Sequence, residues 1–234
     1  METTKTIHFF ILNMKKNADR YQHIEKMLNA IKCSYSRIEA IEGNKMADNL
    51  ECKQLLNTRP ELIDTIMKSI GFKQTWKYDG SILKSFPGLN LIGHEGAKGL
   101  ILSNVKAFQN ALMLDYDWYC ILEDDAIIDS EIYQILCDFV NNPANKTVDI
   151  ILLDDRNYGF GGTAGMMYNM NVIGRVLEDL HPLSNFSITM EKKYGLATLW
   201  DWKLWKYIEN SINPVINFVQ LPCIKSGDFE STIN

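Results

Sequence analysis

The sequence predicts an α/β fold in which helices pack on a largely parallel sheet. Residues 6–41 alternate strand, helix and strand, which is typical of a βαβ unit. Residues 118–122 form an uninterrupted apolar run, as expected of a strand buried on both faces. Two predicted strands end in carboxylates, at 123–125 and 154–155, and ligands of open α/β sheets bind beyond the carboxyl ends of the strands.

The first three elements are a strand at residues 6–12, a helix at 18–31 and a strand at 34–41. The helix is predicted because its apolar residues recur at the spacing of one helix face, at Tyr21, Ile24, Leu28 and Ile31. A right-handed crossover between parallel strands is the default arrangement of such a unit.

The sequence of residues 44–91 predicts a polar, helical insertion within the α/β domain. Short amphipathic pieces and turn signals such as Tyr78-Asp79-Gly80 fill the segment. Its length barely reaches that of an autonomous domain, so we expect residues 1–234 to form one domain. The insertion could serve as a lid, an interface or a surface that faces a membrane.

The middle of the chain continues the alternation. We expect a helix after Gly96 and Gly99, the strand at 118–122, a helix at 129–140 and a strand at 148–153. The first of these helices has an apolar stripe formed by Leu102, Val105, Phe108, Ala111 and Leu112.

The last third begins with a glycine-rich segment, residues 159–165, which is either a close backbone approach to a ligand or a plain connection. Helices are expected at 172–180 and from Asp201 onward, followed by a strand at 215–221 and a polar tail at 223–234.

Composition excludes several classes of protein. Of the 234 residues, 46% are hydrophobic and 23% charged, which is ordinary for a folded globular chain. The net charge of −5 argues against a nucleic-acid partner. Five widely spaced cysteines without a CxxC pair argue against a disulfide framework or a zinc site, and reduced thiols suggest a cytoplasmic protein. The apolar stretch 7–12 is too short for a membrane span, although peripheral contact with a membrane stays open.

The acidic run Glu123-Asp124-Asp125 is the strongest functional signal in the chain. Clustered carboxylates repel one another, so a cation or a hydrogen-bond network usually neutralises them. Carboxylate oxygens favour Mg²⁺ or Mn²⁺, which commonly bridge a protein to substrate phosphates. The alternative is an acidic turn that favours the N-terminus of the helix at 129–140.

Aromatic and histidine side chains give weaker signals. Trp200, Trp202 and Trp205 either stack on a sugar or fill the core, and their helical spacing favours the core. His94 and His181 either bind a metal or are solvated in turns, and isolated histidines favour the second interpretation.

Several segments, taken in order along the chain, resemble glycosyltransferase family 25, the lipooligosaccharide and procollagen galactosyltransferase relatives. The segments that carry the resemblance are Ile11-Leu12-Asn13 with Asp19-Arg20, Tyr35 to Gly43, Ile121 to Ala126, Gly165 to Asn171, Trp200 to Leu204 and Ser231-Thr232-Ile233. The stretch from Gly96 is also similar, but it has Leu100 and Asn104 where the family usually shows Cys and His.

The resemblance implies a GT-A-like α/β/α sandwich and an inverting transfer of a hexose, galactose or glucose, from a UDP-sugar to a hydroxyl of a glycan or glycoprotein acceptor. It further implies that Mn²⁺ or Mg²⁺ is held by Asp125 together with Glu123 or Asp124. Such an ion would stabilise the charge that develops on the leaving diphosphate.

The other expected roles follow from the same resemblance. Asn13 and Arg20 would contact the nucleotide, along with Glu123 and Asp124, although Arg20 could instead pair with an acid on its own helix. Lys98 either approaches the diphosphate or is a surface lysine.

The catalytic base is expected among three acids. Asp201 is the first candidate because it begins a helix after the glycine-rich segment, where a carboxylate can point into a cleft or simply cap the helix. Asp154 and Asp155 are rival bases or donor-sugar contacts.

Two other functions remain open at this stage. Clustered carboxylates with Mg²⁺ also serve nucleotidyltransferases and phosphohydrolases. A carbohydrate-binding relative without catalysis is the second alternative, for which Leu100 and Asn104 leave room.

Overall fold

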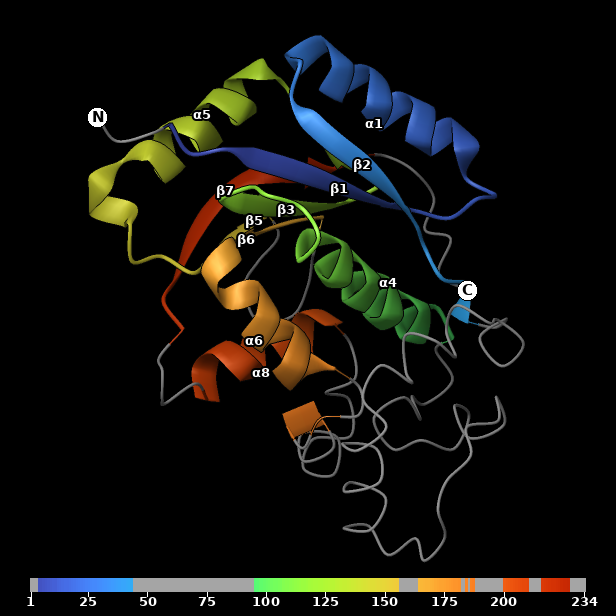
Figure 1. Cartoon of the computed structure of the whole chain (residues 1–234). Coiled ribbons are helices and arrows are strands. Elements are labelled where there is room, and N and C mark those ends of the chain that lie inside the picture. The colour runs from blue at the N-terminus through green and yellow to red at the C-terminus, as the bar shows by residue number, and fades with distance from the viewer. Residues whose placement is uncertain are drawn as a thin grey trace, which may run out of the picture.

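A computed structural model of the chain describes residues 4–43, 95–155, 164–181, 184, 186–187, 200–210 and 216–227. Within them the α/β class predicted from the sequence is confirmed (Figure 1). The expected insertion at 44–91, most of the glycine-rich segment and Ser231-Thr232-Ile233 lie outside the described residues.

The order of elements follows the predicted alternation closely. They are β1 (Ile7–Asn13), α1 (Ala18–Ile31), β2 (Ser34–Glu39), α4 (Glu95–Ala111), β3 (Trp118–Glu123), β4 (Ala126–Ile127), α5 (Ser130–Asn141), the 3₁₀ turn η4 (Pro143–Asn145), β5 (Ile150–Asp154), β6 (Gly165–Asn169), α6 (Met170–Leu180), α8 (Trp200–Asn210) and β7 (Phe218–Ser226).

The strands form one sheet in the order β2-β1-β3-β6-β5-β7-β4. Strands β2, β1 and β3 are mutually parallel, as are β5 and β7. Strand β6 is antiparallel to both β3 and β5, and β4 is antiparallel to β7. Five strands therefore run in one direction, which confirms a largely parallel sheet.

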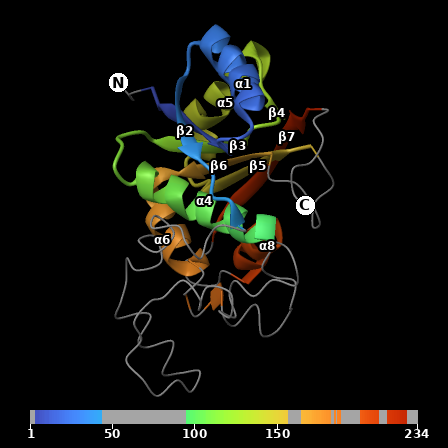
Figure 2. The same cartoon turned by 90° about the vertical axis from the view of Figure 1, so that its right-hand side faces the viewer.

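Helices cover both faces of the sheet, as Figures 1 and 2 show: α1 and α5 lie on one face, and α4, α6 and α8 on the other. Side chains alternate along β1, so that Phe9 and Ile11 pack with Leu28 of α1, while Phe10 and Leu12 pack with Phe108 of α4. The expected α/β/α sandwich is thus the observed architecture, with a separate hydrophobic core on each face of the sheet.

Helix α4 approaches the chain after β2 unusually closely. A Cβ added to Gly99 would lie 2.2 Å from the carbonyl oxygen of Ile41, so only glycine fits there. One turn later, the Ser103 hydroxyl accepts a hydrogen bond from the Ile41 N–H at 2.9 Å and donates one to the Gly99 carbonyl at 2.7 Å. These contacts fix α4 against the end of the first βαβ unit.

The expected polar tail from Cys223 is wrong at its start, because β7 continues to Ser226. Polar residues are tolerated there because backbone pairing with β5 and β4 forms the strand. Pro222 interrupts the apolar pattern, and it lies where the register against β5 shifts in an irregularity, a position that accepts proline. No helix in the described part of the chain is long and apolar enough to span a bilayer.

Candidate active site

The acidic run lies where β3 ends in the middle of the sheet. Glu123 is the last residue of β3, and Asp124 and Asp125 form the turn that leads into β4. Strand β1 runs parallel to β3 with Leu12 opposite Glu123, so Asn13 lies beside the turn. We call residues 123–125 the acidic turn.

Asp124 is bonded to two side chains from the first βαβ unit. Its Oδ2 accepts a hydrogen bond from Asn13 Nδ2 at 2.6 Å, and its Oδ1 lies 3.3 Å from Arg20 Nη1 in an ion pair. All three residues are buried, with exposed fractions of 8% for Asp124, 8% for Arg20 and 0% for Asn13. The structure therefore brings together three residues predicted from the sequence, and Arg20 pairs with the acidic turn.

Asn13 connects this pair to the surface of β2. Its amide also donates to the Asn17 carbonyl at 2.8 Å, and its Oδ1 accepts from Arg37 Nη2 at 2.6 Å. The Arg37 guanidinium lies 4.7 Å from the centroid of the Tyr21 ring. Burial, reinforced by the Glu25 carboxylate, raises the pKa of Tyr21 to about 12, so a neutral ring faces the cation.

Arg37 is a residue that the sequence analysis missed. The signal was present, because parallel pairing of the first two strands brings Arg37 opposite Ile11, close to the end of β1. It was passed over because Arg37 belongs to no acidic or glycine-rich motif.

Backbone hydrogen bonds hold the acidic turn from its other sides. The Glu123 N–H donates to the Ala164 carbonyl at 3.1 Å, just before β6, and the Gly227 N–H donates to the Asp125 carbonyl at 2.6 Å, just after β7. The Oδ1 atom of Asp125 is buried. Only the backbones of Ala164 and Gly227 take part, so their side chains give no sign of these bonds in the sequence, although Ala164 belongs to the glycine-rich segment 159–165.

Asp154 and Asp155 lie at the same edge of the sheet, but their strand is not adjacent to β3. Strand β6 separates β3 from β5, and Glu123 and Asp154 lie on either side of Ala164. The spacing of strands separates their backbones by about 10 Å. The buried Asp154 accepts a hydrogen bond from the Ala164 N–H at 2.8 Å, whereas Asp155 is exposed. Ala164 thus bonds to both acidic strand ends.

The acidic turn has the chemistry of a shared cation site. Among the residues that the structure describes, no group of three or more His, Cys, Asp or Glu side chains could hold a metal ion by itself. Mg²⁺-type ions are commonly bound by one or two carboxylates and completed by substrate phosphates and water. Asp125 and Glu123 fit that second kind of site, in which the donor supplies part of the coordination.

The remaining candidates are placed only in part. Asp201 lies in the first turn of α8, and its side chain, like those of Lys98, Trp202 and Trp205, is outside the described residues, as is His94 altogether. Trp200 is 1% exposed, and its ring lies 5.8 Å from that of Phe108, which confirms the core interpretation for this residue. His181 is buried where α6 ends, so the expectation that it is solvated is wrong.

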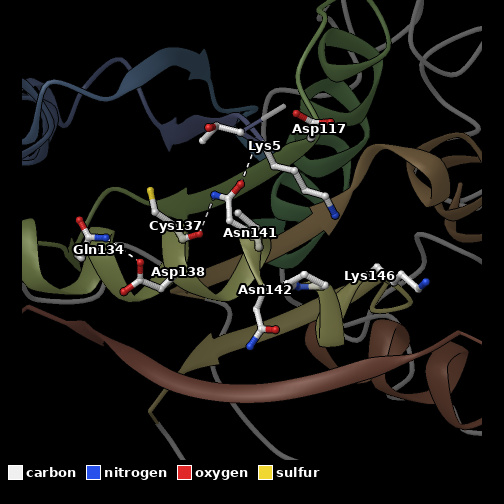
Figure 3. A pocket seen from close by; sticks show the side chains of 11 residues that line it. Lys5, Asp117, Gln134, Cys137, Asp138, Asn141, Asn142 and Lys146 are labelled. Carbon is white, nitrogen blue, oxygen red and sulfur yellow. Dashed lines mark hydrogen bonds between the residues drawn. The ribbon is translucent and has the colours of Figure 1, made fainter. Parts of the chain in front are cut away.

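A pocket of about 770 Å³ lies at the opposite end of the strands, where β1 and β3 begin (Figure 3). Lys5 before β1, Asp117 before β3, and Cys137, Asn141 and Lys146 from α5 and the segment after it are among the lining residues. The Lys5 N–H donates to Asn141 Oδ1 at 2.7 Å across it. None of the residues of the acidic turn lines this pocket.

Comparisons with known proteins bear on the whole chain. The sequence model of glycosyltransferase family 25 (LPS biosynthesis protein) matches residues 6–173, a range that contains β1, the acidic turn and β6. A comparison with curated proteins gave no match.

The solved structures that are similar to this chain include two with a TM-score of 0.47. One is a glycosyltransferase involved in the glycosylation of the major capsid of PBCV-1, with 8% identity, a TM-score of 0.47, and coverage of 97% of this chain and 94% of that one. The other is mouse xyloside xylosyltransferase 1 in its apo form, with 9% identity, a TM-score of 0.47, and coverage of 98% and 99%. The family match covers well over half of the sequence, and the chain therefore belongs to glycosyltransferase family 25.

Proposed function

We propose that this glycosyltransferase is metal-dependent and transfers a hexose, galactose or glucose, from a UDP-sugar to a hydroxyl of a glycan or glycosylated protein, with inversion. The observation that carries the proposal is the acidic turn, which projects from the carboxyl end of β3 inside the range that matches the family. Ligands of open α/β sheets bind at this edge.

Asp125 and Glu123 are the residues proposed to hold the cation. When bound, a divalent ion supplies positive charge at the leaving diphosphate. The hydrogen bonds with the Ala164 carbonyl and the Gly227 N–H fix the backbone of Glu123 and of Asp125. The predicted donor contacts are Asn13, Arg20 and Asp124. Asn13 and Arg20 are both bonded to the Asp124 carboxylate of the same turn.

Inversion requires a base that takes the proton of the acceptor hydroxyl on the face opposite the leaving group. We propose Asp201, at the start of α8, for this role, and Asp155 as the first alternative because it is exposed at the end of β5. Asp154 is less suited, because it is 3% exposed and one of its oxygens already accepts a hydrogen bond from Ala164.

Calorimetry with UDP, UDP-galactose and UDP-glucose, each with and without Mn²⁺, tests the proposal. We expect Mn²⁺-dependent binding that Asp125→Asn abolishes without unfolding the protein, whereas Asp115→Asn, an exposed acid before β3, changes nothing. Absence of metal-dependent UDP binding by the wild type would refute the proposal. Nucleotide release without an acceptor, at a rate independent of the donor sugar, would favour a phosphohydrolase instead.

A further inference from the structure

The charge of Asp124 is already balanced within the protein. One carboxylate oxygen accepts from Asn13, and the other faces the Arg20 guanidinium, at an exposed fraction of only 8%. A buried carboxylate that has lost its water needs such partners, because an unpaired buried charge is strongly unfavourable. These two partners therefore account for the burial of the Asp124 carboxylate without any ligand.

A cation bound to Asp124 would also be repelled by a second positive charge. Arg20 Nη1 lies 3.3 Å from Asp124 Oδ1, so an ion bound to that carboxylate would lie within a few ångströms of the guanidinium. Like charges at that distance repel strongly in a buried site. Asp125, one residue further along, has a backbone that is held by Gly227 of a different strand end.

We propose that Asp124 is a positioning residue: through Asn13 and Arg20 it fixes the acidic turn, and Asp125 of that turn contacts the cation of the donor. The inference rests on the proposed function for the role of Asp125. It gives Asn13, Arg20 and Asp124 a role different from the direct donor contacts that the sequence predicts.

Asn13 is specified by its own hydrogen bonds. Its amide nitrogen donates to both Asp124 and the Asn17 carbonyl, and its oxygen accepts from Arg37. A rotated amide would direct its oxygen at two acceptors and its NH₂ at the guanidinium, which loses all three bonds. At 0% exposure no water could replace them, so Asn13 holds Asp124 in one orientation.

The acidic turn is then held from three directions. The Asp124 side chain ties it to β1 and α1, the Glu123 N–H ties it to Ala164, and the Asp125 carbonyl ties it to Gly227. Residues that orient a metal-binding side chain through other groups commonly matter about 10–100-fold in metal affinity, although they never touch the ion.

A double-mutant cycle on Asp124 and Arg20 tests this inference. We would measure thermal unfolding and Mn²⁺-dependent UDP binding by calorimetry for the wild type, Asp124→Asn, Arg20→Gln and the double variant. Each single change removes one partner of a buried ion pair, so we expect the midpoint of unfolding to fall by about 10 °C. UDP binding should weaken about tenfold in each single variant.

The double variant should recover a large part of both losses, because two neutral amides can bond where the ion pair was. As the comparison, Asp125→Asn should lose Mn²⁺-dependent binding, and adding Arg20→Gln should recover none of that loss. Additive losses in binding, with no recovery in the double variant, would overturn the positioning role and indicate direct donor contacts.

Titration of Mn²⁺ into Arg20→Gln and into the wild type, each with saturating UDP, provides a measurement that does not depend on Asp124→Asn folding. Removal of the guanidinium takes a positive charge away from Asp124. If Asp124 binds the cation, Arg20→Gln would bind Mn²⁺ more tightly than the wild type does, and that result overturns the inference. About tenfold weaker Mn²⁺ binding supports it, and unchanged binding overturns the positioning role. Lack of any UDP binding by the wild type would refute the proposed function, and the unfolding data would then still decide whether Asp124 and Arg20 are coupled.

Discussion

Acid destabilisation through His8 is a prediction whose size can be worked from the structure. His8 is 4% exposed in β1, with Nδ1 2.8 Å from the Ser34 hydroxyl and Nε2 3.0 Å from the Ser36 hydroxyl. The rings of Phe10 and Tyr116 lie against it, with centroids at 4.8 and 4.7 Å. Burial lowers the pKa of His8 from 6.5 to about 4.

The sign of the effect follows from proton linkage. Below pH 6.5 the unfolded chain takes up a proton on His8, whereas the folded protein resists protonation until about pH 4. Folding stability is therefore lost as the pH falls through this window. The difference corresponds to about 3.4 kcal/mol in total, of which about 2 kcal/mol is lost by pH 5.

Urea unfolding, followed by tryptophan fluorescence at pH 8 and pH 5, measures the effect. The loss of unfolding free energy between these pH values should be about 2 kcal/mol larger in the wild type than in His8→Gln, which has no imidazole to protonate. The control variant is His23→Gln, which removes an imidazole from the exposed surface of α1 and leaves His8 in place. Parallel pH profiles for the wild type and His8→Gln would refute the reasoning.

Three further predictions concern stability and are checked by thermal or urea unfolding. Gly99→Ala should lower the free energy of unfolding by about 1–3 kcal/mol, because the new Cβ would lie 2.2 Å from the Ile41 carbonyl oxygen. Gly174→Ala is the control: it is exposed within α6, its Cβ would have no atom closer than 4.0 Å, and it should raise the free energy of unfolding by about 0.5–1 kcal/mol. Equal effects of the two changes would contradict the close approach at Gly99. Leu28→Ala should cost about 2–5 kcal/mol, since Leu28 is 0% exposed between α1 and the sheet, and a loss below 1 kcal/mol would count against this packing. Asp129→Ala should cost about 1 kcal/mol, because its carboxylate accepts from the Ile132 N–H at 2.8 Å as the N-cap of α5, and an unchanged midpoint would rule out that cap.

Local patterns in the sequence were sufficient for the outer frame of the fold. Helix α1 has the predicted bounds, 18–31, because its apolar spacing is regular, and β1 and β2 pair in parallel as a βαβ unit should. The predicted strand at 118–122 is β3, with one more residue at its end. These elements depend on contacts between residues close in the chain or on continuous apolar runs.

Strand β6 shows why the rest could not be predicted. Residues 165–169 are buried throughout, so they have no alternating pattern, and nothing in their sequence indicates that they enter the sheet between β3 and β5 in the opposite direction. The two acidic strand ends, at 123–125 and 154–155, are separated in the sheet by this strand. Pairing between strands distant in the chain is decided by the whole packing, which single-sequence patterns do not record.

The candidate site, like the fold, could be predicted from the sequence only in part. The residues with distinctive chemistry, Asn13, Arg20 and Asp124, were found from the sequence, but their mutual bonding was not, because it joins positions more than 100 residues apart. A motif alone presents Glu123, Asp124 and Asp125 as three equivalent ligands. The geometry distinguishes Asp124 from the other two, because its charge faces Arg20 inside the protein. In the proposed site, the phosphates of the donor would complete the coordination of the ion, so metal binding would be tied to donor binding.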